Sequence, residues 1–148
     1  MKLFLDTNVI MDYIGKRGDD GVTAELLQLT KAFGDADLVV SAKSYTDVFF
    51  TLRRYMDTST LQQAILDTLS LYQVCAIDAD DIAAACQMGW DDFEDALITV
   101  AAEKCGADYL ITRDVSFRKA RVPLLTPQGF FDLMREMGIT YSIVSLDD

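Results

Sequence analysis

Short apolar runs alternate with longer amphipathic segments along the chain. The apolar runs predict five strands, at residues 2–5, 37–41, 74–77, 108–112 and 123–125. Apolar residues at three- and four-residue spacing predict helices at 22–33, 44–57, 58–72, 78–89 and 91–105, with one more after the first strand and another from residue 127. Because long helices separate the strands, we predict an α/β fold, a three-layer sandwich in which helices cover both faces of a parallel sheet of about five strands.

Several helix starts carry residues that cap helices well. Ser41 or Ser44 is suited to cap the helix at 44–57, and Asp91 or Asp92 is suited to cap the helix that ends near residue 105. The pair Thr126-Pro127 combines a capping hydroxyl with a proline at the first helical position. These signals support the same alternation of strands and helices.

Length and composition indicate one ordinary globular domain. The chain has 148 residues, of which 51% are hydrophobic, and we expect a single domain spanning residues 1–148. No apolar run approaches the roughly 18 to 20 residues of a membrane span, and the chain enters its first strand without the apolar core of a signal peptide. We therefore expect a cytoplasmic protein without a membrane partner.

The residue types that are missing limit the possible chemistry. The chain contains no histidine, and its three cysteines are widely spaced without a C-x-x-C pair, so neither a histidine general base nor a usual zinc site is expected. Any catalysis must then rest on carboxylates. With 24 acidic and 13 basic residues, the net charge of −11 argues against a nucleic-acid partner, unless the acids hold divalent cations.

Four acidic positions stand out, each with a structural alternative. Asp6 and Asp114 directly follow predicted strands, where acids commonly form turns. Asp47 lies within a predicted helix among apolar residues, although it could simply favour the positive start of that helix. The cluster at 92–95 could be no more than a cap and an acidic first turn. Taken together, they can meet at the edge of the sheet where the strands end.

Clustered carboxylates at one edge would repel each other strongly without a counter-ion. A cation is one of the few partners that offsets the cost of partly burying a carboxylate. Carboxylate oxygens without histidine or cysteine select hard cations, so the expected cofactor is Mg²⁺ or Mn²⁺.

The order of these motifs resembles a PIN domain over nearly the whole chain. The resemblance rests on Asp6-Thr7-Asn8 after the first strand, an acid in the following helical region, the run 92–98, the segment 107–114 and the late Thr126-Pro127. It implies four acidic metal-site residues, namely Asp6, Asp47, Asp95 and Asp114. It also implies polar supports and neighbouring acids, namely Asn8, Thr112, Asp92 and Glu94.

One position departs from the family pattern. The second acid is usually glutamate, and Asp47 is one methylene shorter. Either the helix that carries Asp47 lies closer to the other acids, or a different acid fills this position.

By the same resemblance, the chain is expected to be a Mg²⁺- or Mn²⁺-dependent ribonuclease, a toxin of the VapC type that a small antitoxin protein inhibits. A homodimer is also common in this family. Hydrolysis assisted by a metal ion needs no general base on the protein, which agrees with the missing histidines, and we expect products with a 5′-phosphate and a 3′-hydroxyl.

Two alternatives stay open. The chain could be a PIN scaffold that binds RNA or a protein partner without cleaving. It could also be a phosphatase similar to the haloacid dehalogenases, but those enzymes need a second aspartate where this chain has Asn8.

Basic residues gather after the strand that delivers Asp114. We predict RNA contacts for four of them, namely Arg113, Arg118, Lys119 and Arg121. The alternative is that they neutralise the surplus acids around them. The segment 78–95 carries seven acids and no base, which suits either a solvated surface or the docking of a basic antitoxin segment.

Overall fold

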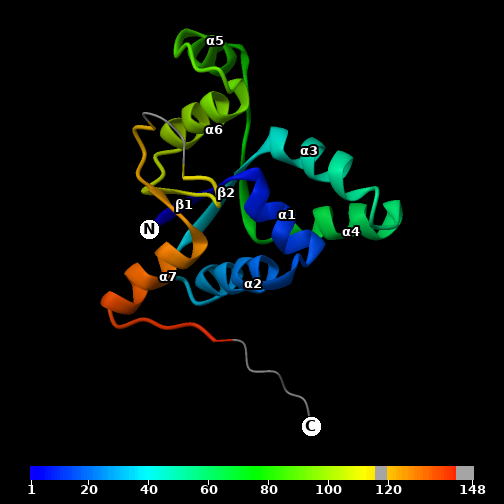
Figure 1. The fold of residues 1–148 in the computed structure, drawn as a ribbon, viewed down its shortest axis with the longest axis vertical. Helices are drawn as coiled ribbons and strands as arrows, with labels where there is room; N and C mark the ends of the chain where they lie inside the picture. The colour runs from blue at the N-terminus through cyan, green and yellow to red at the C-terminus, as the bar shows by residue number, and fades with distance from the viewer. Residues whose placement is uncertain (116–119, 143–148) are drawn as a thin grey trace.

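A parallel sheet forms the centre of the chain in the computed structural model, which describes residues 1–115 and 120–142 (Figure 1). Its strands are β1 (Lys2–Leu5), β2 (Asp37–Ser41), β3 (Tyr72–Cys75), β4 (Tyr109–Ile111) and β5 (Leu124–Leu125). They lie in the order β3-β2-β1-β4-β5, and every neighbouring pair is parallel. The predicted parallel sheet is confirmed.

The described residues form seven helices, six between strands and one after β5. They are α1 (Thr7–Gly15) and α2 (Gly18–Ala32) between β1 and β2, α3 (Ala42–Leu52) and α4 (Thr58–Thr68) between β2 and β3, α5 (Ala79–Gln87) and α6 (Phe93–Lys104) between β3 and β4, and α7 (Pro127–Glu136) after β5. No helix in these ranges is long and apolar enough to cross a membrane.

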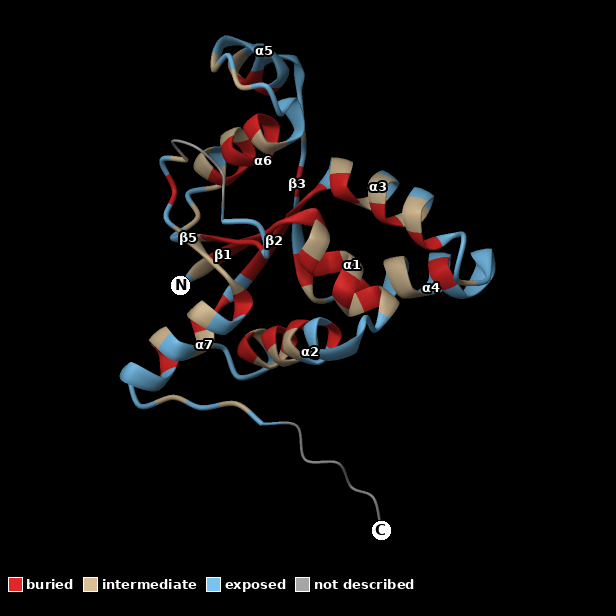
Figure 2. Ribbon diagram, in the orientation of Figure 1, coloured by how far each residue is buried: buried red, intermediate tan, exposed pale blue. Residues whose placement is uncertain are grey.

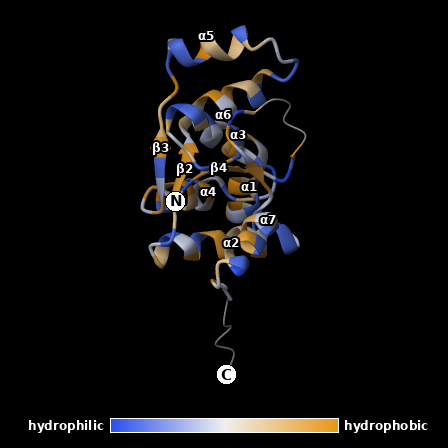
Figure 3. Cartoon of the chain, turned by 90° about the vertical axis from the view of Figure 1, so that its left-hand side faces the viewer, coloured by the Kyte–Doolittle hydropathy of each residue, from blue (hydrophilic) through white to orange (hydrophobic). Residues whose placement is uncertain are grey.

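The two faces of the sheet carry different helices, because side chains alternate along each strand. Leu3, Leu5 and Val40 point into a core built mainly with α1, α2, α3, α4 and α7. Phe4 and Val39 point to the other face, where α6 packs. The side view in Figure 3 shows α5 and α6 on one side of the sheet and α2 and α7 on the other. The predicted three-layer arrangement is therefore confirmed.

Burial is concentrated on the strands and on the inner helices. Figure 2 shows α5 mostly exposed, whereas α1 is largely buried. Leu3, Phe4 and Leu5 are fully buried, and each such side chain contributes roughly 1.5–3 kcal/mol of transfer free energy. The central strand β1 is thus a rigid support for whatever follows its end.

Polar side chains cap the helices that begin near the carboxyl edge of the sheet. The Oδ1 atom of Asp6 accepts a hydrogen bond from the Thr7 N–H at 2.7 Å, at the start of α1. Ser41, rather than Ser44, caps α3 by accepting from the Lys43 N–H at 3.2 Å. Thr126 caps α7, as predicted. The positive ends of α1 and α3 therefore face the same edge.

The helix predicted at 44–57 is wrong at both ends. Capping by Ser41 starts α3 at residue 42, and the helix ends at Leu52, whose carbonyl accepts hydrogen bonds from the N–H groups of Tyr55 and Met56 in a turn. Asp57 does not end this helix but caps the next one. The apolar spacing continues through Tyr55 and Met56, so the pattern hides the turn.

The strand predicted at 74–77 begins two residues earlier, at Tyr72, and the preceding helix ends at Thr68 rather than at residue 72. Tyr72 pairs with Leu38 of β2 and is buried in the core. A buried aromatic residue fits the apolar face of a helix and a strand equally well, so periodicity misplaces this boundary. Likewise, α2 begins at Gly18 rather than at the predicted Val22. Its first turn is polar, so the apolar spacing does not indicate it.

Candidate active site

The candidate site lies where the chain order of the sheet reverses. From β1 the chain continues to β2 and β3 on one side, while β4 leads to β5 on the other. Leu5 pairs with Ile111, and the Asp6 N–H donates to the Ile111 carbonyl at 2.9 Å, so the residues after β1 and β4 leave the sheet together. Such switch points are where open α/β sheets bind ligands.

Asp6 is held firmly at this point. Its side chain is buried, and its Oδ2 atom accepts hydrogen bonds from the Thr112 hydroxyl at 2.7 Å and from the Asn8 amide at 3.3 Å. Burial raises the pKa of Asp6, although the hydrogen bonds from Thr112 and the Thr7 N–H partly offset this effect. The carboxylate is therefore fixed in orientation while its charge remains only partly compensated.

Thr112 and Asn8 connect the segment after β4 to α1. The Thr112 hydroxyl, which donates to Asp6, accepts from the Asp114 N–H at 3.0 Å and from the Asn8 amide at 3.3 Å. The side-chain oxygen Oδ1 of Asn8 accepts a hydrogen bond from the Arg113 backbone N–H at 3.3 Å. These bonds place both residues in direct contact with Asp6, and their supporting role stays a prediction.

The start of α6 brings further acids to the same place. Asp92, rather than Asp91, caps this helix by accepting from the Asp95 N–H at 3.0 Å. Partial burial, followed by the charges of Asp92, Asp6 and Asp114, raises the pKa of Asp95 to about 7. Burial is the largest cause of this raised pKa, and the three nearby carboxylates add to it.

Asp47 is brought to the cleft by α3, but a lysine accompanies it. The Lys43 ammonium donates to the Oδ2 atom of Asp47 at 2.7 Å and lies 3.5 Å from a carboxylate oxygen of Glu94. Burial lowers the pKa of Lys43, but the hydrogen bond to Asp47 and the charge of Glu94 outweigh it and raise the pKa overall. Lys43 therefore bridges α3 and α6 as a built-in cation. Lys43 was not among the predicted site residues, although its four-residue spacing from Asp47 is a usable signal in the sequence.

One open cleft of about 410 Å³ gathers these side chains. Its lining comprises Asp6, Thr7, Asn8, Met11, Asp47, Phe50, Thr51, Asp92, Glu94, Asp95 and Asp114. All four expected metal-site acids are present, together with Asn8, Asp92 and Glu94, while Thr112 is buried beside Asp6. The contributions of Met11, Phe50 and Thr51 were not expected from the sequence.

The donor chemistry of this cleft fits a hard cation, because carboxylates dominate it and the pKa values of Asp6 and Asp95 are raised. As the side chains stand, however, no group of three or more acidic or cysteine residues among residues 1–115 and 120–142 meets the geometry of a bound metal ion. The acids surround the cleft without converging on one point. Binding a cation would require side-chain rotation, chiefly where Lys43 holds Asp47.

Comparison with known proteins agrees with this geometry. The sequence profile of the PIN-domain family matches residues 2–116. The chain belongs to the PIN-domain family. Ribonuclease VapC1 of Aquifex aeolicus (strain VF5) is 26% identical over 137 residues, which cover 87% of this chain and 92% of the relative.

Solved structures show the same PIN fold. VapC20 of Mycobacterium tuberculosis, described as a toxin that cleaves the sarcin-ricin loop, superposes with a TM-score of 0.66 at 19% identity, covering 81% of this chain and 95% of that one. VapBC2 of Rickettsia felis, bound to a promoter DNA fragment, superposes with a TM-score of 0.65 at 18% identity, covering 85% and 98%.

The basic residues of this PIN domain have different surroundings. Arg121 is exposed, and its Nε atom lies 3.6 Å from a carboxylate oxygen of Glu103. The guanidinium of Arg113 points to Asp12 of α1. Arg118 and Lys119 lie outside the described residues. The expected RNA contacts of all four basic residues stay predictions.

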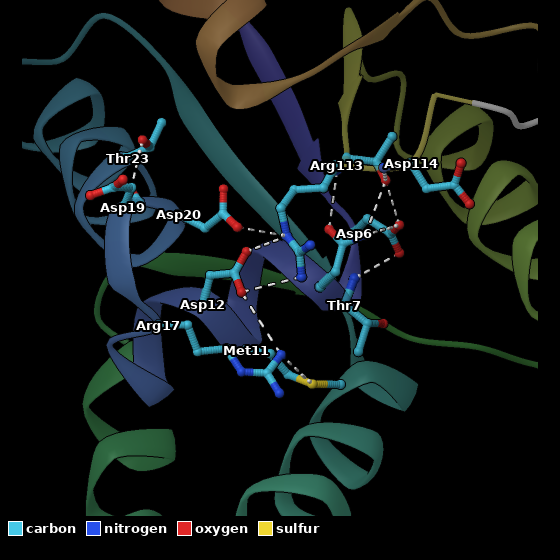
Figure 4. Close-up of polar contacts among 12 residues, drawn as sticks. Asp6, Thr7, Met11, Asp12, Arg17, Asp19, Asp20, Thr23, Arg113 and Asp114 are labelled. Atoms are coloured by element: carbon cyan, nitrogen blue, oxygen red, sulfur yellow. Dashed lines mark hydrogen bonds and ion pairs between the residues drawn. The ribbon is translucent and has the colours of Figure 1, made fainter.

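Asp12 is the acidic residue near the site that sequence analysis overlooked. It is buried in α1, and both of its carboxylate oxygens face Arg113 (Figure 4). Asn8 and Asp12 are four residues apart and therefore lie on one face of α1, the face that contacts the segment after β4.

Proposed function

We propose that this PIN domain is a divalent-metal-dependent endoribonuclease and the toxin of a toxin–antitoxin pair. The observation that carries the proposal is the acidic cleft at the switch point of the sheet, in which partial burial and then neighbouring carboxylates raise the pKa of Asp95 to about 7. The relative from Aquifex aeolicus, which is named a ribonuclease, supports RNA as the substrate.

Four residues would hold the cation: Asp6, Asp47, Asp95 and Asp114. When bound, Mg²⁺ or Mn²⁺ supplies activation of water at neutral pH and neutralises charge on the scissile phosphate. Asp47 would exchange the ammonium of Lys43 for the metal.

The chain itself contributes orientation and charge. Thr112 and Asn8 hold the Asp6 carboxylate in one orientation by hydrogen bonds. The N-terminus of α6, which carries Asp92 and Asp95, offers partial positive charge to anionic groups at the cleft. Lys43 provides one full positive charge near the position that a phosphodiester would approach.

Partners follow from the same proposal. Single-stranded RNA is the substrate, and a small antitoxin protein is the inhibitor, as supported by similarity to structures of toxin–antitoxin complexes. The homodimer, the cytoplasmic location and the chemistry of the product ends stay predictions.

The second candidate function is a PIN scaffold that binds without cleaving. Two observations favour it: the acids of the described residues do not converge as they stand, and Lys43 already neutralises Asp47. Membership of the PIN-domain family removes the haloacid-dehalogenase-like phosphatase from consideration.

Cleavage of a single-stranded RNA separates the two candidates. The ribonuclease requires cutting with added Mn²⁺, loss of cutting in EDTA, and loss of cutting in Asp95→Asn. Asp91→Asn is the matched control, because Asp91 is adjacent to the acidic cluster but does not line the cleft. RNA binding without cleavage by the wild-type protein would establish the scaffold instead.

A further inference from the structure

Asp12 is the most buried carboxylate in the described part of the chain, with only 3% of its side chain exposed. It does not line the acidic cleft. Its partner is Arg113, whose Nε atom donates to Oδ2 at 2.6 Å and whose Nη2 atom donates to Oδ1 at 3.3 Å. This bidentate geometry, hereafter the two-pronged pair, is the strongest and most directional form of an arginine–carboxylate pair.

Arg113 occupies the middle of the segment that carries two site residues, Thr112 and Asp114. Figure 4 shows the side chain of Arg113 extending toward Asp12 of α1 and that of Asp114 extending to the other side of this segment. Asp114 lines the acidic cleft. Because Asp114 is the next residue in the chain, a contact that fixes Arg113 also restricts the position of Asp114.

Helix α1 contacts this segment at two levels, one helical turn apart. Asn8 accepts from the Arg113 N–H at 3.3 Å, and Asp12 accepts from the Arg113 guanidinium. Both contacts come from the helix that Asp6 begins. The same rigid element thus carries one site acid and holds the backbone next to another.

The surroundings of the pair indicate a role in geometry. Arg17 lies 3.8 Å from Asp12, and Asp20 lies 3.9 Å from Arg113, so each partner has a weaker second neighbour of opposite charge. Asp12 is buried, whereas the Arg113 side chain is 39% exposed. The cost of desolvating the buried carboxylate offsets part of the attraction between the two charges, so the pair is expected to contribute little net stability. Its directional bonds nevertheless fix the relative position of two segments.

We propose that Asp12 and Arg113 are positioning residues that hold Thr112 and Asp114 in register with Asp6. This proposal rests on the proposed function, because it assigns to the pair the affinity of that site for its divalent cation. It also gives Arg113 a task different from the RNA contact that the sequence suggested. Neither residue touches the reacting atoms; both act through Asp114.

The first experiment is a calorimetric titration of Mn²⁺ into metal-free protein in the absence of RNA. The double variant Asp12→Asn/Arg113→Gln removes both charges and therefore leaves no buried charge without a partner. We expect its dissociation constant for Mn²⁺ to rise by roughly 10-fold or more, as is common when residues that orient metal ligands are replaced. Cleavage should lose kcat, while KM for RNA should change little.

The controls are Arg17→Gln and Asp20→Asn, which remove the weaker neighbours but keep the two-pronged pair. Both should retain wild-type Mn²⁺ affinity. Arg113→Lys keeps the charge without the fork-shaped donor and should restore only part of the affinity. Wild-type affinity in the folded double variant would overturn the proposal.

A second readout needs neither metal nor activity. Hydrogen exchange of the Asp114 amide, which donates to Thr112, should be several-fold faster in the metal-free double variant than in wild type or Asp20→Asn. Unchanged exchange would contradict the positioning role, whether or not the wild-type protein binds Mn²⁺. Absence of Mn²⁺ binding to the wild-type protein would instead refute the proposed function. If Arg113→Gln weakened RNA binding but kept both Mn²⁺ affinity and slow exchange, Arg113 would be an RNA contact instead.

Discussion

On the side of the cleft formed by β1 and β4, Asp6 is buried and takes hydrogen bonds from Thr112 and Asn8. On the side formed by α3 and α6, Asp47 and Glu94 are partly exposed and share the ammonium of Lys43. The first side is supported by neighbouring strands of a sheet, whereas the second is held by the ion pairs of one lysine side chain. The site is therefore rigid where the sheet supports it and adjustable where two helices face each other.

This difference explains why the acids surround the cleft without converging. A permanent cation on the adjustable side stabilises Asp47 and Glu94 while no metal is bound. A divalent ion, with twice the charge, can compete for the same oxygens. Variants that remove a hydrogen bond on the first side should therefore mainly lower thermal stability, whereas variants at Lys43 should mainly change the affinity for Mn²⁺.

The largest effect is expected when a site acid loses its charge. Asp6→Asn, Asp95→Asn and Asp114→Asn should each lower the cleavage rate on the order of 10²-fold, about 3 kcal/mol of transition-state stabilisation. Single-turnover cleavage of RNA in Mn²⁺ measures this, with circular dichroism as the test of folding. Full activity in any of the three would remove that residue from the site.

The rigid side should be broken by removing one hydroxyl. Thr112→Val removes one of the two donors that lie 2.7 Å from the Asp6 carboxylate, and it removes the hydroxyl that accepts from the Asp114 N–H, which costs roughly 1–3 kcal/mol of unfolding free energy. Thermal melting should show a fall of about 2–4 °C for each kcal/mol in a chain of this size. Thr112→Ser keeps the hydroxyl and serves as the control. Equal melting of all three proteins would show that these hydrogen bonds do not contribute.

On the side formed by α3 and α6, loss of Lys43 should strengthen Mn²⁺ binding. Lys43→Met removes a positive charge that competes for Asp47, so Mn²⁺ affinity should rise a few-fold, while melting of the metal-free protein changes little because exposed ion pairs contribute about 0–1 kcal/mol. Lys43→Arg is the matched control. Weaker Mn²⁺ binding in Lys43→Met would mean that Lys43 holds the acids in place for the metal.

At the second acid itself, Asp47→Ala should strongly reduce cleavage, whereas Asp47→Glu should keep measurable activity because it restores the residue that PIN domains usually carry. Initial cleavage rates in Mn²⁺ measure both variants. If Asp47→Ala were as active as wild type, another acid would fill this position.

The smallest effect concerns pH. The folded pKa of Asp95 is about 7, well above its ordinary value of 3.8, so the folded protein binds more protons than the unfolded chain between these values. The unfolding free energy of the metal-free protein should therefore fall as pH rises from about 4 to 7, and level off above 7. Solvent screening limits the change to about 1 kcal/mol, or roughly 2–4 °C in Tm. Asp95→Asn should show a flatter profile between pH 4 and 7.

Much of the fold could be predicted because its signals are local. The strand β1 and the caps Asp92 and Thr126 occupy the expected positions, and Asp6 and Asp114 were found because they follow strands. The start of β3 was missed because the apolar face of Tyr72 suits a helix or a strand equally well.

The features that sequence analysis missed depend on contacts between distant residues. Asp12 and Arg113 are separated by 101 positions, and nothing in the local pattern around Asp12 distinguishes a buried, paired carboxylate from an acid on a solvated helix surface. The bridge from Lys43 to Glu94 likewise forms only when α3 and α6 meet. Local patterns indicate which acids stand near strand ends, whereas packing decides which cation each acid contacts.

The most direct measurement is a calorimetric titration of Mn²⁺ into the metal-free wild-type protein at pH 7, repeated in buffers with different ionisation enthalpies. We expect saturable binding accompanied by proton release, because Asp95 is partly protonated at this pH and must ionise to bind the metal. Asp91→Asn should behave as wild type, whereas Asp95→Asn should bind more weakly and release fewer protons. Absence of Mn²⁺ binding, or binding that is the same in wild type, Asp6→Asn and Asp95→Asn, would contradict a metal site in this cleft.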